Sequence, residues 1–112
     1  MRHPFQAEVR EIIELLVARR YAELGRRTAA KRLTSVEIAA AVNAYGRTLI
    51  NPPVEVFEKL DAIQITGAVP PAWSVRVDLW TAEEGRSDLT MKLTVVQNGK
   101  HYDIELDDLR VL

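Results

Sequence analysis

The stretch from Thr81 to Asp88 is the densest run of polar side chains in the chain, and its adjacent carboxylates suggest chemistry. Paired carboxylates can bind a metal or act as acid and base, provided that they occupy different environments or point at one substrate atom. Adjacent side chains of an extended segment point to opposite sides, and the spacing of a calcium loop is absent. We therefore expect a solvated turn at Gly85, with an arginine paired to a carboxylate. Its candidate recognition residues are Glu83, Glu84, Arg86, Ser87 and Asp88.

Patterns typical of other catalytic or cofactor sites are missing from the sequence. The chain has no cysteine, so it can form neither a disulfide nor a thiolate metal site. His3 and His101 lie far apart, no G-x-S-x-G motif is present, and five scattered glycines build no phosphate-binding loop. We expect no catalytic residue, no metal and no cofactor. The sequence favours a non-enzymatic protein without establishing one.

A second candidate feature is the basic stretch over residues 19–32, in which only Glu23 opposes six cations and the balance is +5. Such a stretch could bind phosphates or an acidic protein surface. The net charge of −1 for the whole chain, and Tyr21 as the only aromatic residue of the stretch, argue against nucleic acid. The favoured interpretation is a solvated helix surface. The residues of this candidate patch are Arg19, Arg20, Arg26, Arg27, Lys31 and Arg32.

Charge is distributed unevenly between the two halves of the chain. Residues 1–53 carry nine Lys or Arg against five Asp or Glu, whereas residues 54–112 carry six against eleven. The first half is therefore basic and the second acidic. The simpler interpretation is that oppositely charged faces of one domain attract each other or the solvent. The alternative is a polarised surface for a charged partner.

Length and hydropathy predict one domain over residues 1–112 and no membrane segment. A chain of 112 residues with 47% hydrophobic content has the size and composition of a single globular domain. The apolar run over residues 12–17 contains Glu14 and is flanked by charged residues, so it is too short and too charged for a signal peptide or a membrane span. We expect a cytoplasmic location, with which the lack of cysteine is compatible.

The first half of the chain carries helical patterns. Apolar residues at steps of three and four predict a helix over residues 4–19, and a short helix or turn follows over residues 21–25, interrupted at Gly25. Thr34 and Glu37 have the spacing of a capping box, which predicts a helix that ends at Gly46. Its expected apolar stripe consists of Val36, Ile38, Ala41, Val42 and Tyr45.

The second half carries strand patterns after a corner at residues 51–53, where two prolines cannot donate backbone hydrogen bonds. One or two helical turns are expected over residues 54–60, a strand over residues 60–66 and a loop over residues 67–71. A strand with strict alternation follows, with Trp73, Val75, Val77 and Leu79 on one face. Trp80 breaks this alternation, which indicates a bulge, a sheet edge or an exposed aromatic side chain at an interface.

Asn98-Gly99 predicts a hairpin, because Asn-Gly is the preferred pair for a two-residue type I′ turn. With residues 98 and 99 as the two loop positions, the apolar pairs across the hairpin are Val95 with Tyr102, Leu93 with Ile104, and Met91 with Leu106. The opposite face then pairs Lys92 with Glu105 and Thr94 with Asp103.

These elements together predict an α+β fold in which two or three N-terminal helices pack on a C-terminal antiparallel sheet of about four strands. The order of elements is similar to that of the cystatin-like and nuclear-transport-factor-like folds. In those folds helices lie in the concave side of a curved sheet.

Three segments resemble a family of small bacterial proteins of unknown function. They are Trp80–Thr90, with the sequence W-T-A-E-E-G-R-S-D-L-T, the C-terminal D-D-L-R-V-L over residues 107–112, and Tyr45–Leu49. The resemblance implies a bacterial, cytoplasmic protein with a compact α+β fold, and it supplies no catalytic residue. It also implies that the E-E-G-R-S-D-L segment is either held in place structurally or used as a recognition surface.

Three hypotheses of function remain open from the sequence. The leading one is a non-enzymatic protein-binding module, such as a small bacterial immunity protein, or a module that self-associates through its sheet near Trp80. The second is a small-ligand-binding protein or enzyme with a pocket between helices and curved sheet, lined by Trp73, Tyr45, Tyr102 and one or two carboxylates. The third is nucleic-acid binding through residues 19–32.

Overall fold

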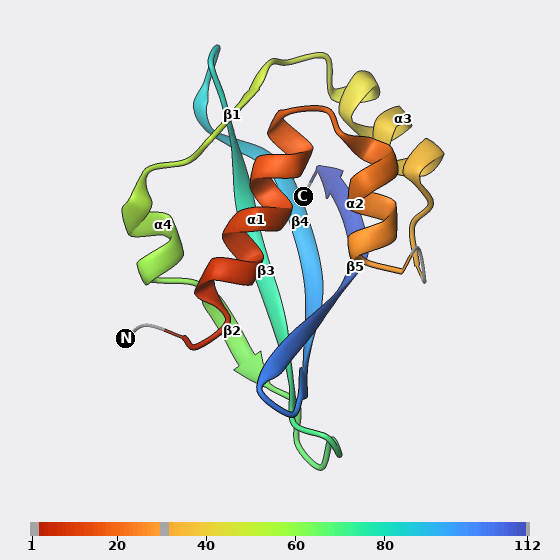
Figure 1. Cartoon of the computed structure of the whole chain (residues 1–112). Helices are drawn as coiled ribbons and strands as arrows, with labels where there is room; N and C mark the ends of the chain where they lie inside the picture. Colours follow the sequence, from red (N-terminus) through yellow and green to blue (C-terminus); the bar gives the residue numbers. More distant parts are fainter. Residues whose placement is uncertain (1–2, 30–31, 112) are drawn as a thin grey trace.

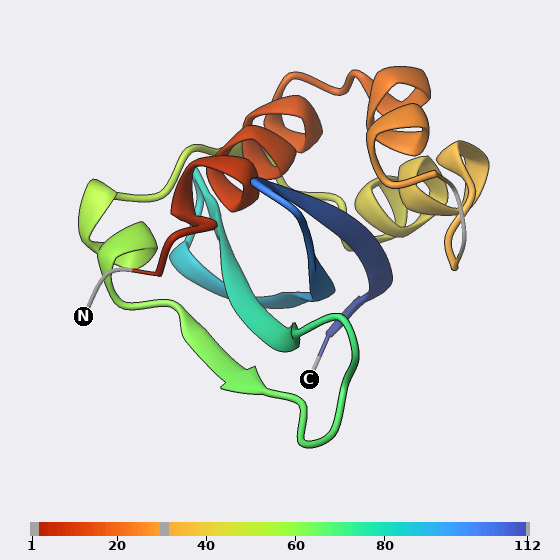
Figure 2. The same ribbon diagram turned by 60° about the horizontal axis from the view of Figure 1, so that its bottom comes forward.

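The computed structural model describes residues 3–29 and 32–111 and confirms an α+β fold, with helices first and an antiparallel sheet after them (Figure 1). The helices precede or interrupt the strands of one sheet, which curls as a half-barrel (Figure 2). The elements are α1 (Gln6–Val17), α2 (Tyr21–Arg27), α3 (Ser35–Tyr45), β1 (Leu49–Ile50), α4 (Val54–Glu58), β2 (Asp61–Gln64), β3 (Ala72–Thr81), β4 (Gly85–Asn98) and β5 (His101–Val111). No helix in the described part of the chain is long and apolar enough to cross a membrane.

The sheet has the order β1-β3-β4-β5, and β2 pairs with the same edge of β3 as β1 does. β1 pairs with β3 at residues 80–81, and β2 pairs with it at residues 73–76. Residues 77–79 of β3 therefore have no strand partner on this edge. We call this interruption the strand gap.

The corner at residues 51–53 explains the strand gap. Proline has no backbone N–H to donate, so β1 cannot continue along β3 through Pro52 and Pro53. The chain leaves the sheet there, forms α4, and returns as β2 at Asp61. The predicted corner, the helical turns after it and the strand that follows are all confirmed.

The core lies between the helices and the face of the sheet that they cover. α1 contributes to the core the apolar side chains that recur at steps of three and four, as predicted. β3 contributes the alternating Val75, Val77 and Leu79. The side chains fill this space as one continuous apolar cluster. Its fully buried members include Phe5, Val9, Ile12, Ile13, Leu16, Leu24, Ile38, Val75, Met91, Leu93 and Val95.

The prediction that Gly25 interrupts the second helix is wrong. α2 continues to Arg27, with Gly25 buried inside it. A Cβ atom at Gly25 would lie 3.5 Å from the Cβ of Ser35, at the start of α3. Glycine is therefore explained by the close approach of α2 and α3. The helix stops at Thr28, whose hydroxyl donates to the carbonyl of Leu24 at 3.0 Å.

The third helix begins and ends where its caps predicted. The Thr34 hydroxyl accepts from the Glu37 backbone N–H, the Glu37 carboxylate accepts from the Thr34 N–H, and Gly46 has a φ of 74°. Its apolar stripe is narrower than predicted, because Val36 is 76% exposed. Val36 lies in the first turn, on the side away from the core, and only Ile38 and Val42 are buried.

The predicted register of the β4–β5 hairpin is wrong by two residues. The loop positions are Gly99 and Lys100, so Val95 pairs with Ile104 and Leu93 with Leu106. Gly99 has a φ of 62° and Lys100 has no positive φ, which is the arrangement of a type II′ turn. Glycine at its first central position is what that turn prefers.

The shift leaves the apolar face unchanged, because a displacement of two residues preserves the alternation of a strand. Met91, Leu93, Val95, Ile104 and Leu106 are buried as predicted. Tyr102 is half-buried against them. The charged pairs predicted on the other face are wrong, since Glu105 lies opposite Thr94 and Asp108 opposite Lys92.

Candidate functional site: a cationic cluster on the outer face of the sheet

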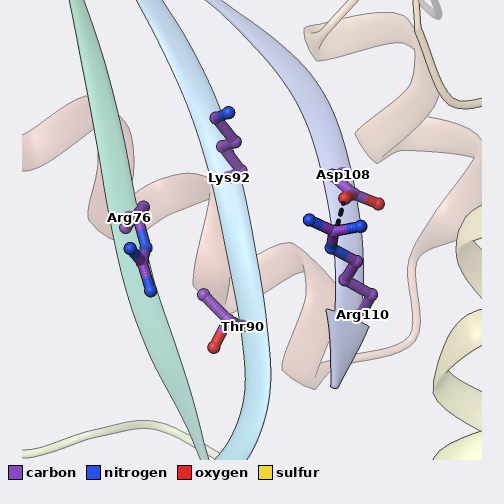
Figure 3. A pocket seen from close by; sticks show the side chains of 5 residues that line it. All are labelled: Arg76, Thr90, Lys92, Asp108 and Arg110. Carbon is purple, nitrogen blue, oxygen red and sulfur yellow. Dashed lines mark ion pairs between the residues drawn. The ribbon is translucent and has the colours of Figure 1, made fainter. Parts of the chain in front are cut away.

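The face of the sheet turned away from the core, which we call the outer face, carries polar side chains on all three long strands (Figure 3). Three of them are cations from neighbouring strands: Arg76 on β3, Lys92 on β4 and Arg110 on β5. With Thr90 and Asp108 they line a depression of about 210 Å³. We call these three residues the cationic cluster. No local sequence pattern indicated this cluster, because its members come from three different strands.

Strand register brings the cluster together. Arg76 lies opposite Lys92, which lies opposite Asp108. In the neighbouring row of outer-face residues, Asp78 lies opposite Thr90, which lies opposite Arg110. Neighbouring strands are about 4.8 Å apart, so the side chains of the two rows share one small area.

A β-bulge in β5 is needed for this arrangement. Leu93 pairs with Leu106, but Lys92 pairs with Asp108, so Asp107 is an extra residue in β5. Without the bulge, the register of the hairpin would place Arg110 opposite Leu89 and turn it toward the core. The sequence does contain a signal for the bulge, because the apolar alternation of Ile104 and Leu106 resumes at Leu109 and skips position 108.

The charges of the cluster are only partly neutralised. Arg110 is bound to Asp108, with Nε 3.0 Å from Oδ2. Arg76 and Lys92 form no ion pair with any described residue, although Asp61 lies opposite Arg76 in the register with β2. Like charges directly opposite each other on two strands are destabilising. By this rule the Arg76–Lys92 pair is unfavourable, although Asp61 and Asp108 lie opposite its two members, and both cations are open to an anion.

The floor of the depression is fixed by Thr90. This side chain points to the outer face and is nevertheless only 5% exposed. Its hydroxyl donates to Asp78 Oδ1 at 3.0 Å. The hydroxyl proton is thus already engaged, and an anion bound here would take its hydrogen bonds from the arginines and the lysine.

A second depression of about 300 Å³ adjoins the cluster at the strand gap. We call it the gap pocket. Its apolar walls come from Val56, Leu60, Val77 and Trp80, and its charged rim from Lys59, Asp61, Arg76, Asp78 and Arg86. Arg76 lines both depressions. Trp80, a predicted interface residue, lies half-buried on the outer face. The register between β3 and β4 shifts next to it, which agrees with the bulge that its broken alternation indicated.

Glu83 of the predicted recognition segment lies in the three-residue turn between β3 and β4 and is held by the connection after α3. Its carboxylate accepts from the backbone N–H of Thr48 at 2.9 Å and from the Thr48 hydroxyl at 3.0 Å. The hydrogen bond from the Thr48 backbone is the main reason why the pKa of Glu83 is lowered. Glu83 thus attaches the turn to the start of β1.

Glu84 is held by the end of α3. The Tyr45 hydroxyl donates to its two carboxylate oxygens, at 2.8 and 2.9 Å, and the Thr81 hydroxyl donates at 3.2 Å. Burial, together with the hydrogen bond to Glu84, raises the pKa of the Tyr45 hydroxyl. The two glutamates bind different groups and do not face one common atom.

Arg86, Ser87 and Asp88 belong to β4 and not to a loop. Ser87 is 5% exposed, donates to the carbonyl of Leu79 at 2.7 Å and accepts from the N–H of Leu89 at 3.2 Å. These bonds lie where the register between β3 and β4 shifts, so the hydroxyl replaces missing backbone bonds. Arg86 and Asp88 are exposed, and the expected ion pair of Arg86 is not formed with any described residue.

Among the described residues, three cations of the basic stretch lie close to carboxylates, two of which belong to other segments. Arg27 binds Glu11 at 2.9 Å, Arg20 binds Glu23 at 2.7 Å, and Arg32 lies 3.8 Å from Asp107. Arg19 and Arg26 are exposed, whereas Lys31 lies outside the described residues. Three of its cations are thus already matched by carboxylates.

The three aromatic residues expected to line one interior pocket are separated in the structure. Trp73 and Tyr102 pack with Phe5, with ring centroids 5.2 to 6.2 Å apart. Tyr45 lies at the other end of β4, bound to Glu84. Nor do three or more His, Asp or Glu side chains converge as metal ligands within residues 3–29 and 32–111.

Comparisons with known proteins agree with the expectation of an uncharacterised family. No curated protein and no solved structure matches the chain. A family model described as a domain of unknown function, DUF7668, matches residues 13–112, which include every strand and both depressions. The chain therefore belongs to the DUF7668 family.

Proposed function

We propose that this protein is a non-enzymatic protein-binding module whose cationic cluster binds an acidic side chain of a partner protein. The observation that carries the proposal is the un-neutralised Arg76–Lys92 pair on the outer face. Its like charges cost stability in the free protein, and a carboxylate placed between them would relieve that cost. Arginine also offers a planar fork of donors that matches a carboxylate.

The size of the depression favours one functional group over a whole small molecule. Ligand pockets typically enclose about 300 to 1,000 Å³. The depression at the cluster encloses about 210 Å³. A single carboxylate at the end of a side chain fits this space, whereas a larger ligand would also have to occupy the adjoining depression of about 300 Å³.

The surroundings of the cluster favour an acidic protein segment over nucleic acid. Asp78 and Asp108 lie on the same outer face, and Asp88 is an exposed residue of β4. Nucleic acid presents a continuous row of phosphates, which these aspartates would repel. An isolated acidic side chain with neutral neighbours would meet Arg76 and Lys92 without bringing further negative charge beside these aspartates.

The conspicuous polar groups of the turn and of the start of β4 support a non-enzymatic role. Glu83, Glu84 and Ser87 all make hydrogen bonds within the protein, and these bonds attach the β3–β4 turn or close the β-bulge. They thereby serve the fold and the outer face that it presents. A partner that the module neutralises, in the manner of a small bacterial immunity protein, is the more specific form of this proposal. A toxin gene beside the gene for this protein would support that form.

The proposal can be tested by NMR titration of the ¹⁵N-labelled protein with a short serine-rich peptide that contains two glutamates. The control peptide has glutamine at both positions. We expect shifts at Arg76, Thr90, Lys92 and Arg110 with the glutamate peptide only, weakened by added salt. Equal responses to both peptides, or shifts confined to residues 19–29, would overturn the proposal.

Matched variants make the test specific. Replacing Arg76 and Lys92 together by glutamine should abolish the response to the glutamate peptide. The control replaces Arg26 and Lys100 by glutamine, which removes the same charge from an exposed helix position and the hairpin turn. Loss of the response in both double variants would indicate a non-specific charge effect and would contradict a site at the cluster.

A further inference from the structure

The strand gap opens a second depression beside the cationic cluster. Between its pairings with β1 and β2, β3 presents residues 77–79 to an edge that no described strand occupies. The excursion through the two prolines and α4 lines this opening with side chains from a helix, a strand and their connection. The result is the gap pocket of about 300 Å³.

The walls of the gap pocket are mainly apolar. Val56 from α4, Val77 from β3 and Trp80 meet there with Leu60, which precedes β2. Charged side chains stand at the rim, where their aliphatic stems can extend the apolar wall and their charged ends remain in water. An apolar pocket with a charged rim is the arrangement of the anchoring positions in protein interfaces.

The gap pocket and the cationic cluster are parts of one surface, because Arg76 lines both. The cluster is centred on β4, and the gap pocket lies beyond β3. With strands about 4.8 Å apart, their centres are separated by about 10 Å. A peptide in the polyproline II conformation covers that distance in three residues, at about 3.1 Å each, and its three residues per turn keep the first and fourth side chains on one face.

We infer that the gap pocket takes a large apolar side chain, such as leucine or phenylalanine, from the same partner segment whose carboxylate binds the cationic cluster. This inference rests on the proposed function and makes the recognised chemistry specific. The partner presents an acidic residue and an apolar residue three positions apart in a polyproline II segment, in which both side chains lie on one face. The acidic side chain meets the cations, and the apolar side chain is buried against Val56 and Trp80.

The experiment compares two acidic peptides that differ at one position, three residues after the second glutamate. This position is phenylalanine in one peptide and serine in the other. Burial of a phenylalanine side chain should raise affinity about tenfold or more. A third peptide retains the phenylalanine and replaces the glutamates by glutamine. Affinities are measured by NMR titration, which also locates the shifts.

Two variants separate the gap pocket from the cluster. Val56→Trp places a larger side chain in the pocket, and Trp80→Ala removes one of its walls. Either variant should reduce the affinity of the phenylalanine peptide to that of the serine peptide and leave the serine peptide unaffected. Val54→Trp on the same helix is the control, because Val54 is 45% exposed and does not line the pocket.

The outcomes distinguish this inference from the proposed function. If both acidic peptides bind equally, or if Val56→Trp retains the preference for phenylalanine, the apolar pocket is refuted and the proposed function stands. If neither acidic peptide binds, the proposed function falls, and the inference that rests on it falls too. Shifts at Val77 and Trp80 with the phenylalanine peptide alone would support the binding chemistry of the pocket directly.

Discussion

Arg76 on β3 lies directly opposite Lys92 on β4, with both side chains on the outer face of the sheet. Neither forms an ion pair with a described residue, although the neighbouring Arg110 does. A pair of like charges at this position is costly for the folded protein and useful for binding an anion. This relationship connects the stability of the sheet with its proposed function.

The cost of the like-charge pair can be measured directly. Lys92→Glu replaces repulsion by attraction to Arg76, so the free energy of unfolding should rise by about 0.2 to 1 kcal/mol, less any new repulsion from Asp108. Lys100→Glu makes the same charge change in the hairpin turn and should have a smaller effect. Urea denaturation followed by circular dichroism provides the comparison. A lower stability for Lys92→Glu than for Lys100→Glu would contradict the argument.

Ser87 should be a strong determinant of stability. Ser87→Ala leaves the carbonyl of Leu79 and the N–H of Leu89 without their buried partner. The expected loss is about 1 to 3 kcal/mol of unfolding free energy. Hydrogen exchange of the Leu89 amide should also accelerate. Ser74→Ala, on the outer face of β3, is the control, and an equal loss in both variants would show that Ser87 has no special role.

Glu83 predicts a dependence of stability on pH. Because its folded pKa is lowered, chiefly by the Thr48 backbone N–H, its contribution is present above the ordinary glutamate value of 4.5. The contribution is lost as the pH falls through the folded pKa. Wild type should therefore exceed Glu83→Gln in stability at pH 7, and the difference should shrink at pH 3. Glu55→Gln, an exposed position on α4, is the control. A difference independent of pH would contradict this account.

The type II′ turn predicts that substitutions at Asn98 and Gly99 have different effects on stability. Gly99→Ala forces alanine to a φ of 62° and should cost roughly 1 kcal/mol or more. Asn98→Thr places a β-branched residue at a strand position and should be tolerated, apart from the loss of a hydrogen bond to Asp103. Thermal denaturation of the two variants distinguishes this turn from a type I′ turn. In a type I′ turn, Asn98→Thr would be the more damaging of the two changes.

Short-range patterns determined much of this fold. The capping box at Thr34, the glycine cap at Gly46, the corner at Pro52 and the alternation of β3 all depend on residues close together in sequence, so they could be predicted. The hairpin shows where such prediction ends. The glycine at position 99 indicates a tight turn, but it fits both a type I′ turn at residues 98–99 and a type II′ turn at residues 99–100. These two turns give strand registers that differ by two residues.

Other features depended on contacts between distant segments. Gly25 is explained by Ser35 on another helix, and the roles of Glu83 and Glu84 by Thr48 and Tyr45. These partners are separated by 10 to 39 positions in sequence, so no local pattern could assign them.

The amino-acid sequence by itself determined an α+β fold, its apolar sheet face and both ends of α3, because these follow from local periodicity and capping. Only the tertiary structure decided the cationic cluster and the gap pocket. The cluster requires the register of three strands and the bulge at Asp107, and the pocket requires the interruption between β1 and β2. Both are products of strand pairing, which joins residues according to their place in the sheet and not their distance along the chain.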